Sequence, residues 1–343
     1  MRHRLLAALC ALASLLAVLP PTAGADMEPI PYTVARGDTA TAIARRHGIS
    51  LADLSRWNPG LNLDRLRAGA RIVVGEGWAI DHEVLPRETV GGIAARHRVT
   101  RRQLALWNPD VHLDRLGAGT HLRIYSPQPP PSESVGRVDR GSLVNGVPLP
   151  EHPGYHVRNP ERAWMTADAA ERLARAFDAV VRAHPDAPRV EVRDASRPEG
   201  GRLDQHHSHQ TGRDVDLAYY RDACRGALCA LHWMTPGQLD ADLQWALLSH
   251  WLDHDDVEYV FIDHSLQEPL RAAALRAGAP RARTSRWFQF PRPAEHRVGV
   301  VRHVPRHTNH LHVRFRCAPG DTRCLPSDGS DPEDAPDTDR PDA

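Results

Sequence analysis

One short stretch of the chain concentrates side chains that can bind metals or transfer protons. Three histidines and two aspartates fall within HHSHQTGRDVD, residues 206–216, and His209 and Asp216 lie seven positions apart. A second stretch, HTNHLHVRF, carries three more histidines: His307, His310 and His312. Catalytic zinc sites take three ligands of these types and leave a position for water. The two stretches together predict a divalent metal centre. The mixed nitrogen and carboxylate donors suit Zn²⁺, and other divalent metals are the alternative.

Strand geometry would bring these donors to one point. DVDLAYY and HLHVRF both predict strands, in which alternate side chains share a face. Asp214 and Asp216 would therefore share one face of their strand, and His310 and His312 would share one face of theirs. If the two strands are neighbours, they direct a histidine, an aspartate and a second histidine at a common position.

Helices and strands interleave over residues 138–325, which we interpret as one domain. Amphipathic helices are predicted at 167–184 and 235–253, and strands at 189–196 and 257–263. Such an order of elements predicts an α+β domain with a central, mainly antiparallel sheet and flanking helices.

The N-terminal part repeats itself with an offset of fifty residues. Residues 31–75 align with residues 81–125, and a Trp-Asn-Pro triplet recurs at the same place in both copies. Each copy predicts a strand, two short helices and a closing strand, with apolar residues on one face of each helix. This pattern resembles the LysM module, a βααβ unit that binds the N-acetylglucosamine backbone of peptidoglycan or chitin. The alternative is that both modules are spacers.

One turn differs between the two copies. Arg87 stands where Gly37 precedes the first helix of the other copy. If this turn requires a left-handed backbone, the second module carries conformational strain there. Whether the second module binds glycan is left open by this difference.

The segments outside these domains have their own compositions. A positive N-terminus, a short apolar run and an A-x-A site predict a signal peptide at 1–25, and hence a periplasmic or secreted protein. An uncleaved N-terminal anchor is the alternative; after signal cleavage, no stable membrane span is expected. Residues 126–137 are rich in proline and predict an extended linker. The acidic, proline-rich tail at 326–343 predicts disorder.

Cysteine content and charge narrow the function further. The four cysteines after the signal peptide are spaced for two small disulfide loops, Cys224–Cys229 and Cys317–Cys324. Four cysteines allow three pairings, and a structural zinc held by four thiolates is the competing interpretation. The formal net charge is zero, which argues against nucleic acid as a partner because nucleic-acid binding needs a basic field.

Three motifs of the larger domain together resemble the penicillin-insensitive murein endopeptidase family, which belongs with the zinc D-Ala-D-Ala peptidases and lysostaphin-type enzymes. They are SRPEGG (196–201), HHSHQTGRDVD and HTNHLHVRF, and the run at 141–164 adds to them. The resemblance implies His209, Asp216 and His312 as the zinc ligands. It implies an endopeptidase that hydrolyses the D-alanyl–meso-diaminopimelyl crosslink of murein, while the LysM modules hold the glycan strands of peptidoglycan.

Roles follow for the other polar residues. The chain has no H-E-x-x-H motif to supply a glutamate base, so we expect His310 to be the general base and His307 its rival or its orienting partner. By resemblance, His206 lines the site. Asp214 would fix a ligand imidazole or be purely structural. Arg197 would bind a substrate carboxylate or brace its loop.

Other functions use the same residues. A D,D- or L,D-carboxypeptidase of the same metallopeptidase group would have the same ligands and differ in the shape of its cleft. A secreted lysin would use the same chemistry at another destination. A non-catalytic peptidoglycan-binding protein would retain zinc for structure alone. Analysis of digested, crosslinked muropeptides separates these functions.

Overall fold

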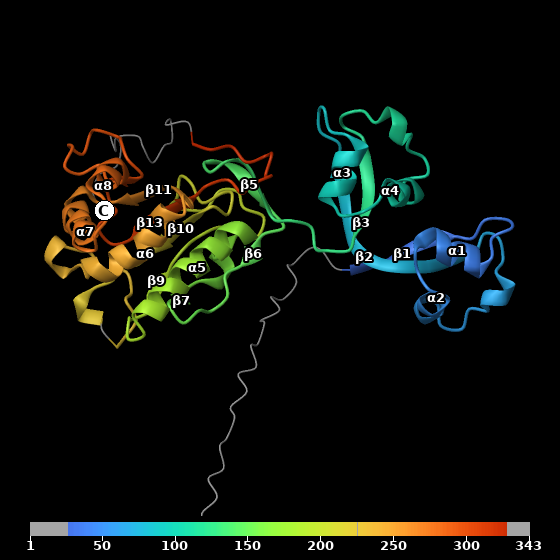
Figure 1. Cartoon of the computed structure of the whole chain (residues 1–343), viewed down its shortest axis with the longest axis horizontal. Helices are drawn as coiled ribbons and strands as arrows, with labels where there is room; N and C mark the ends of the chain where they lie inside the picture. The colour runs from blue at the N-terminus through green and yellow to red at the C-terminus, as the bar shows by residue number, and fades with distance from the viewer. Residues whose placement is uncertain (1–26, 225, 328–343) are drawn as a thin grey trace, which may run out of the picture.

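The computed structural model describes residues 27–224 and 226–327 (Figure 1). The predicted signal peptide at 1–25 and all but the first two residues of the predicted tail at 326–343 lie outside these ranges. Within the ranges, the structure has no helix with the length and apolar character that crossing a bilayer requires.

The N-terminal part has the two expected βααβ units, but one strand serves both of them. Its elements are β1 (Met27–Thr33), α1 (Ala40–His47), α2 (Leu51–Trp57), β2 (Arg71–Glu83), α3 (Val90–Arg96), α4 (Arg101–Trp107) and β3 (His121–Ser126). The first half of β2 pairs antiparallel with β1, and its second half pairs antiparallel with β3. The two modules therefore share a three-stranded sheet, with no break between them.

The two modules also share side-chain packing. Each has its own apolar core, and Trp107 packs against both cores. The Trp107 ring lies edge-on to Tyr125, with 5.5 Å between the ring centroids. An ion pair of 2.6 Å between Arg123 and Glu28 joins β3 to β1. Shared packing and a shared strand make the pair of modules one structural unit.

Capping residues explain where the module helices begin. Thr39 and Thr89, fifty residues apart, cap α1 and α3 by accepting hydrogen bonds from backbone N–H groups of the first turn. Reciprocal capping boxes begin α2 and α4. The repeat therefore extends beyond the apolar residues to the polar residues that start each helix.

The larger domain is built on a six-stranded sheet in the order β12-β11-β13-β10-β9-β7. Its strands, and those of two small sheets beside it, are β4 (Glu133–Arg137), β5 (Arg140–Val144), β6 (Val147–Pro148), β7 (Tyr155–Val157), β8 (Trp164–Met165), β9 (Val190–Val192), β10 (Asp214–Leu217), β11 (Val257–Ile262), β12 (Val301–His303) and β13 (Leu311–Phe315). Its helices are α5 (Ala167–Ala183), α6 (Ala241–Asp253), α7 (His264–Arg276) and α8 (Arg281–Trp287). The inner pairings are antiparallel and the two outer ones are parallel, which confirms the α+β class with a mainly antiparallel sheet.

Some predicted boundaries need correction. The linker predicted at 126–137 is wrong at both ends, because Ser126 ends β3 and residues 133–137 form β4, which pairs with β5. The helix predicted from 235 begins as a 3₁₀ turn, Pro236–Gln238, and becomes α6 at Ala241. Sequence periodicity missed α7, which contains Pro269 in its interior, a residue that normally ends a helix.

Side chains on the two central strands separate a core face from a polar face. Val215 of β10 and Val313 of β13 belong to the apolar core that α5 and α6 complete. Figure 1 shows these helices packed across one face of the sheet. Residues at the alternate positions of both strands point to the opposite face. The functional side chains lie on that second face.

Both predicted disulfides are present. Cys224 is bonded to Cys229, and Cys317 is bonded to Cys324. The pairing by proximity is confirmed, and within the described residues these four sulfurs are not available as thiolates for a structural zinc.

The turn before α3 has the left-handed backbone that the comparison of the two modules suggested. Arg87 has φ 67°, close to the φ of 88° at Gly37. The same exchange occurs after the first helix of each module, where Gly48 has φ 71° and Arg98 has φ 53°. A left-handed conformation costs a non-glycine residue about 1–2 kcal/mol. The second module therefore carries backbone strain at two turns that glycines occupy in the first.

Replacing Arg87 with glycine is expected to stabilise the second module. The gain should be about 1 kcal/mol, because glycine removes the left-handed penalty but adds chain entropy to the unfolded state. Amide hydrogen exchange of Leu122 and Ile124 in β3 measures this local opening energy. The reciprocal change, Gly37→Arg, should destabilise the first module by a similar amount. Equal exchange in Arg87→Gly and the parent protein would show that the turn is unstrained.

Candidate metal centre

The pairing of β10 with β13 brings the two polar stretches together. In the antiparallel register Asp216 lies opposite His312, and Asp214 lies opposite Arg314. All four side chains point to the face of the sheet that the helices leave uncovered, and each is at most 2% exposed. Segments about a hundred residues apart in the sequence thus form one buried polar cluster.

The loop before β10 adds two more histidines to this cluster. Three residues of the loop have left-handed backbones: Gln205 (φ 71°), His209 (φ 64°) and Gly212 (φ 71°). A Cβ atom at Gly212 would lie 2.9 Å from the backbone nitrogen of Thr166, so only glycine fits there without a shift. The backbone between His209 and Asp216 therefore turns tightly at Gly212. His209 itself is held in a conformation that a side chain rarely adopts.

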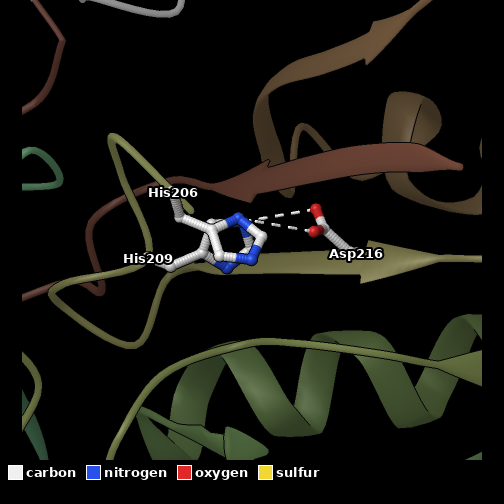
Figure 2. A group of neighbouring side chains, drawn as sticks. All are labelled: His206, His209 and Asp216. Atoms are coloured by element: carbon white, nitrogen blue, oxygen red, sulfur yellow. Dashed lines mark ion pairs between the residues drawn. The ribbon is translucent and has the colours of Figure 1, made fainter. Parts of the chain in front are cut away.

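Four imidazoles converge on the carboxylate of Asp216. Its Oδ1 lies 3.2 Å from His209 Nε2, 3.5 Å from His312 Nδ1 and 3.8 Å from His310 Nε2. Its Oδ2 lies 3.7 Å from His206 Nδ1. Figure 2 shows the rings of His206 and His209 side by side, both directed at this carboxylate.

The other nitrogen of each ring is bonded to an oxygen that can only accept. The pairs are His209 Nδ1 with the Ala195 carbonyl (2.7 Å), His312 Nε2 with Asp214 Oδ1 (2.9 Å), His310 Nδ1 with Asn309 Oδ1 (2.6 Å) and His206 Nε2 with Asp194 Oδ2 (3.1 Å). The proton of a neutral imidazole must therefore reside on these outer nitrogens. The nitrogens that face Asp216 are then acceptors.

A group of acceptors around a buried carboxylate is the donor set of a cation site. Burial raises the pKa of Asp216, but positive charge at the positions of His209 and His310 holds that pKa well below its usual range, and a cation shared by these rings would act in the same direction. The carboxylate is thus ionised, and within the described chain its buried Oδ1 accepts no hydrogen bond. His206, His209 and Asp216 place their ligand atoms within 4.8 Å of one another, and His312 approaches from β13. A divalent cation fits these residues, because imidazole and carboxylate acceptors can bind one such ion together.

Asp214 organises the surroundings of this centre. Its Oδ1 accepts hydrogen bonds from His312 and from Arg314 Nε (2.7 Å), and its Oδ2 accepts one from the backbone N–H of His209 (3.3 Å). Burial raises the pKa of Asp214, but the Arg314 charge and the His312 hydrogen bond lower it further, to well below the usual range. This single carboxylate therefore orients one imidazole and the backbone of another.

His310 is placed to move a proton. Burial lowers its pKa to about 4, so the ring is neutral near neutral pH and its Nε2 can accept a proton. The ring of His307 lies tilted beside it, with 4.6 Å between the ring centroids, and the Nδ1–H of His307 donates to the Pro305 carbonyl at 3.0 Å. Tyr219 donates a hydrogen bond to the carbonyl of His307 and anchors this turn.

A groove outside the cluster is linked to it through Arg162. It has a volume of about 690 Å³, and Arg197, Arg162 and Trp164 contribute to its walls. Arg162 also forms an ion pair of 3.1 Å with Asp194, the carboxylate that holds His206. Arg197 lies in this groove and approaches Asp204 at 3.5 Å, so it contacts none of the imidazoles described above.

Sequence reasoning identified the inner residues and missed their supports. The structure brings together His206, His209, Asp214, Asp216, His307, His310 and His312. Their roles as ligands or bases remain predictions. Asp194, Asn309 and Arg314 escaped notice, although each bonds a residue of the cluster. Arg314 lies two residues after His312 on β13, and this period-two spacing was the only sequence signal that it shares a face with the cluster.

Comparison with known proteins supports both resemblances that the sequence indicated. The LysM domain model matches residues 32–75 and 82–124. The model of the penicillin-insensitive murein endopeptidase family matches residues 134–232, a stretch that starts within β4 and includes His209 and Asp216. The sequence-based recognition of this family and of two LysM modules is confirmed.

Individual relatives agree with the family models. Proteins called penicillin-insensitive murein endopeptidase from Klebsiella pneumoniae subsp. pneumoniae and Yersinia enterocolitica serotype O:8 are both 27% identical to this chain. The matches cover 56% and 63% of this chain and 69% and 75% of those proteins.

Solved structures give only weak likenesses. The spore cortex-lytic enzyme SleL of Bacillus megaterium aligns with a TM-score of 0.18 at 18% identity, over 43% of this chain and 29% of that one. The Bacillus cereus enzyme aligns with a TM-score of 0.15 at 15% identity, over 72% and 47%. The chain thus spans less than half of either structure.

Removing the charge of Asp214 is expected to destabilise the larger domain strongly. Asp214→Asn should lower its free energy of unfolding by about 3–5 kcal/mol, because buried Arg314 loses its ion pair of 2.7 Å with this carboxylate. Denaturant titration followed by hydrogen exchange of the β13 amides measures the change. Asp253→Asn is the matched control: its ion pair with Arg283 (3.0 Å) is about half exposed, so the cost should stay below about 1 kcal/mol. Equal costs for both variants would contradict the central role of Asp214.

Proposed function

We propose that this chain is an exported zinc endopeptidase that binds peptidoglycan and hydrolyses the peptide crosslinks of murein. The observation that carries the proposal is the convergence of imidazole acceptors on the buried, ionised carboxylate of Asp216. The matched murein endopeptidase family and its relatives supply the substrate class. The two disulfides support a site of action outside the reducing cytoplasm.

His209 Nε2, Asp216 Oδ1 and His312 Nδ1 would hold the zinc. Two imidazoles and one carboxylate are a usual catalytic set for zinc, which leaves a position for water. Hydrogen bonds from the outer ring nitrogens to Ala195 and Asp214 fix the two ligand imidazoles, as the outer shell of a metal site must. His206 lies against the same carboxylate and would border the open position.

The protein residues would manage the proton and the substrate. When bound, zinc supplies a Lewis acid that polarises a carbonyl and activates water at neutral pH. The neutral His310 would accept a proton from the attacking water through Nε2 and deliver it to the departing amine nitrogen as the peptide C–N bond breaks. Asn309 Oδ1 would accept a hydrogen bond from the Nδ1–H of His310 and so keep Nε2 of that ring directed at the centre.

The groove beside His206 would bind the peptide stems. Arg162 and Arg197 line it, and the planar guanidinium fork suits the free carboxylates that such stems carry. The D-alanyl–meso-diaminopimelyl bond is the crosslink proposed as the substrate. Because Arg162 also holds Asp194, the groove and the His206 ring are connected through one ion pair.

The two LysM modules would keep the enzyme on its substrate. Binding to glycan strands raises the local concentration of attached stem peptides without a tight catalytic site. A shared β2 strand fixes the two modules to each other, so both would meet the glycan as one unit.

The zinc site is tested by replacing His209 with alanine. Loss of one ligand is expected to release the metal and abolish release of crosslinked muropeptides, measured by mass spectrometry of a sacculus digest. Binding to sacculi should persist, because the modules do not depend on His209. His207→Ala is the matched control, since His207 is a neighbouring exposed histidine and should retain both zinc and activity. Undiminished hydrolysis by His209→Ala would rule out the proposed enzyme.

His310 and His307 are separated by their effects on turnover. His310→Ala should lower kcat by about 10²–10⁴-fold while zinc content stays at the parent level, because the variant loses the base but keeps all three metal ligands. His307→Ala should have a smaller effect on kcat, as expected for an orienting neighbour. Turnover of defined muropeptide dimers, together with metal analysis, measures both. The reverse order of effects would assign the proton transfer to His307.

A further inference from the structure

A second group of imidazole and carboxylate donors lies at the C-terminal end of α6. His250 is in the last turn of this helix, His254 is its C-cap residue, and Asp256 directly precedes β11. One ligand atom from each residue lies within 4.8 Å of those of the other two. The imidazole centroids are 4.4 Å apart, as expected for side chains four positions apart on one helix face.

This group is separate from the centre around Asp216. Helix α6 covers the apolar face of the sheet, where Trp251 meets Phe315 of β13 edge-on at 5.8 Å. Asp216 and His312 point to the opposite face. The three donors of α6 and its C-terminal loop therefore belong to the helix layer.

The ring of His254 has the tautomer and orientation that metal binding requires. Its Nδ1 lies 2.7 Å from the carbonyl oxygen of His250, which can only accept, so Nδ1 carries the proton and Nε2 is an acceptor. His209 has the same arrangement with the carbonyl of Ala195. A hydrogen bond from the outer ring nitrogen to a carbonyl is the usual support of a metal-ligating imidazole.

The other two residues direct buried polar atoms into the group. His250 Nε2 and Asp256 Oδ2 are buried and, within the described part of the chain, neither has a hydrogen-bond partner. Asp256 is 6% exposed. Buried polar atoms are normally satisfied, and a cation would satisfy these two atoms together with the acceptor nitrogen of His254.

Two arginines near Asp256 do not fill this role. Arg172 Nε and Arg175 Nη2 lie 3.6 and 3.7 Å from Oδ1 of Asp256, not from Oδ2. Each arginine has a closer carboxylate on α5, since Arg172 lies 2.8 Å from Asp168 and Arg175 lies 2.8 Å from Glu171. Both arginines therefore pair with Asp256 only at long distance and through Oδ1, which leaves Oδ2 directed at the imidazoles.

We propose that His250, His254 and Asp256 form a second zinc-binding site that joins the end of α6 to the start of β11. Two imidazoles and one carboxylate suit zinc among the common divalent ions. The bound ion would tie the helix layer to the sheet at the turn that follows α6. It would contribute to stability and take no part in hydrolysis.

Metal stoichiometry of the full chain tests the site. After equilibrium dialysis against zinc, His254→Ala is expected to hold one zinc fewer per chain than the parent, measured by mass spectrometry of the metal. Because His254 is exposed, its loss should leave the fold and the crosslink hydrolysis unchanged. His184→Ala, an exposed histidine at the C-cap of α5, is the matched control and should keep the parent count.

The difference between variants separates this site from the catalytic one. A fall from two zinc ions to one in His254→Ala supports both sites, and a fall from one to none supports the α6 site alone. Zinc should also raise the unfolding temperature of the parent and of His184→Ala more than that of His254→Ala. Equal zinc content and equal thermal shifts in His254→Ala, Asp256→Asn and the parent would overturn the proposal.

Discussion

The register between β10 and β13 is the constraint on which the candidate centre depends. It sets Asp216 against His312 and Asp214 against Arg314 on one face, and it sets Val215 against Val313 on the other. Side chains alternate with period two, so a slip of one residue would move every polar group into the apolar core. The core under α5 and α6 therefore specifies the polar face as strictly as it specifies its own packing. A single register therefore meets two requirements: it buries the valines on one side of the sheet and brings the polar residues of the candidate centre together on the other.

The supports of the imidazoles decide what this polar face can do. Each ring donates a hydrogen bond from its outer nitrogen to an oxygen that can only accept, so each presents an acceptor inward. Acceptors repel one another and the Asp216 carboxylate, and the fold must hold them together at a cost in free energy. The left-handed backbone of His209 adds about 1–2 kcal/mol to that cost. Strain gathered at one buried point is typical of a functional site, and a cation would relieve the electrostatic part of it.

Much of the fold and of the inner cluster could be predicted from the sequence, because both follow local rules. Period-two alternation identified HLHVRF as a strand, and the fifty-residue repeat identified the modules. What escaped prediction depends on long-range contacts. Asp194 and Asn309 act only through the rings that they hold, and nothing in their local sequence indicates it. The β4 strand was missed because its pairing with β5, and no pattern of its own, defines it. Helix α7 was missed because Pro269 in its interior normally signals the end of a helix.

The division of the chain into a LysM unit and a larger domain follows from how each is stabilised. The modules bury little apolar surface separately, and the shared β2 strand and Trp107 compensate by merging two small cores into one assembly. The larger domain has a core of its own and can carry a cluster of buried charges without losing its fold. A proline-rich stretch, now limited to 127–132, separates the two. Each unit is therefore stabilised by its own interactions.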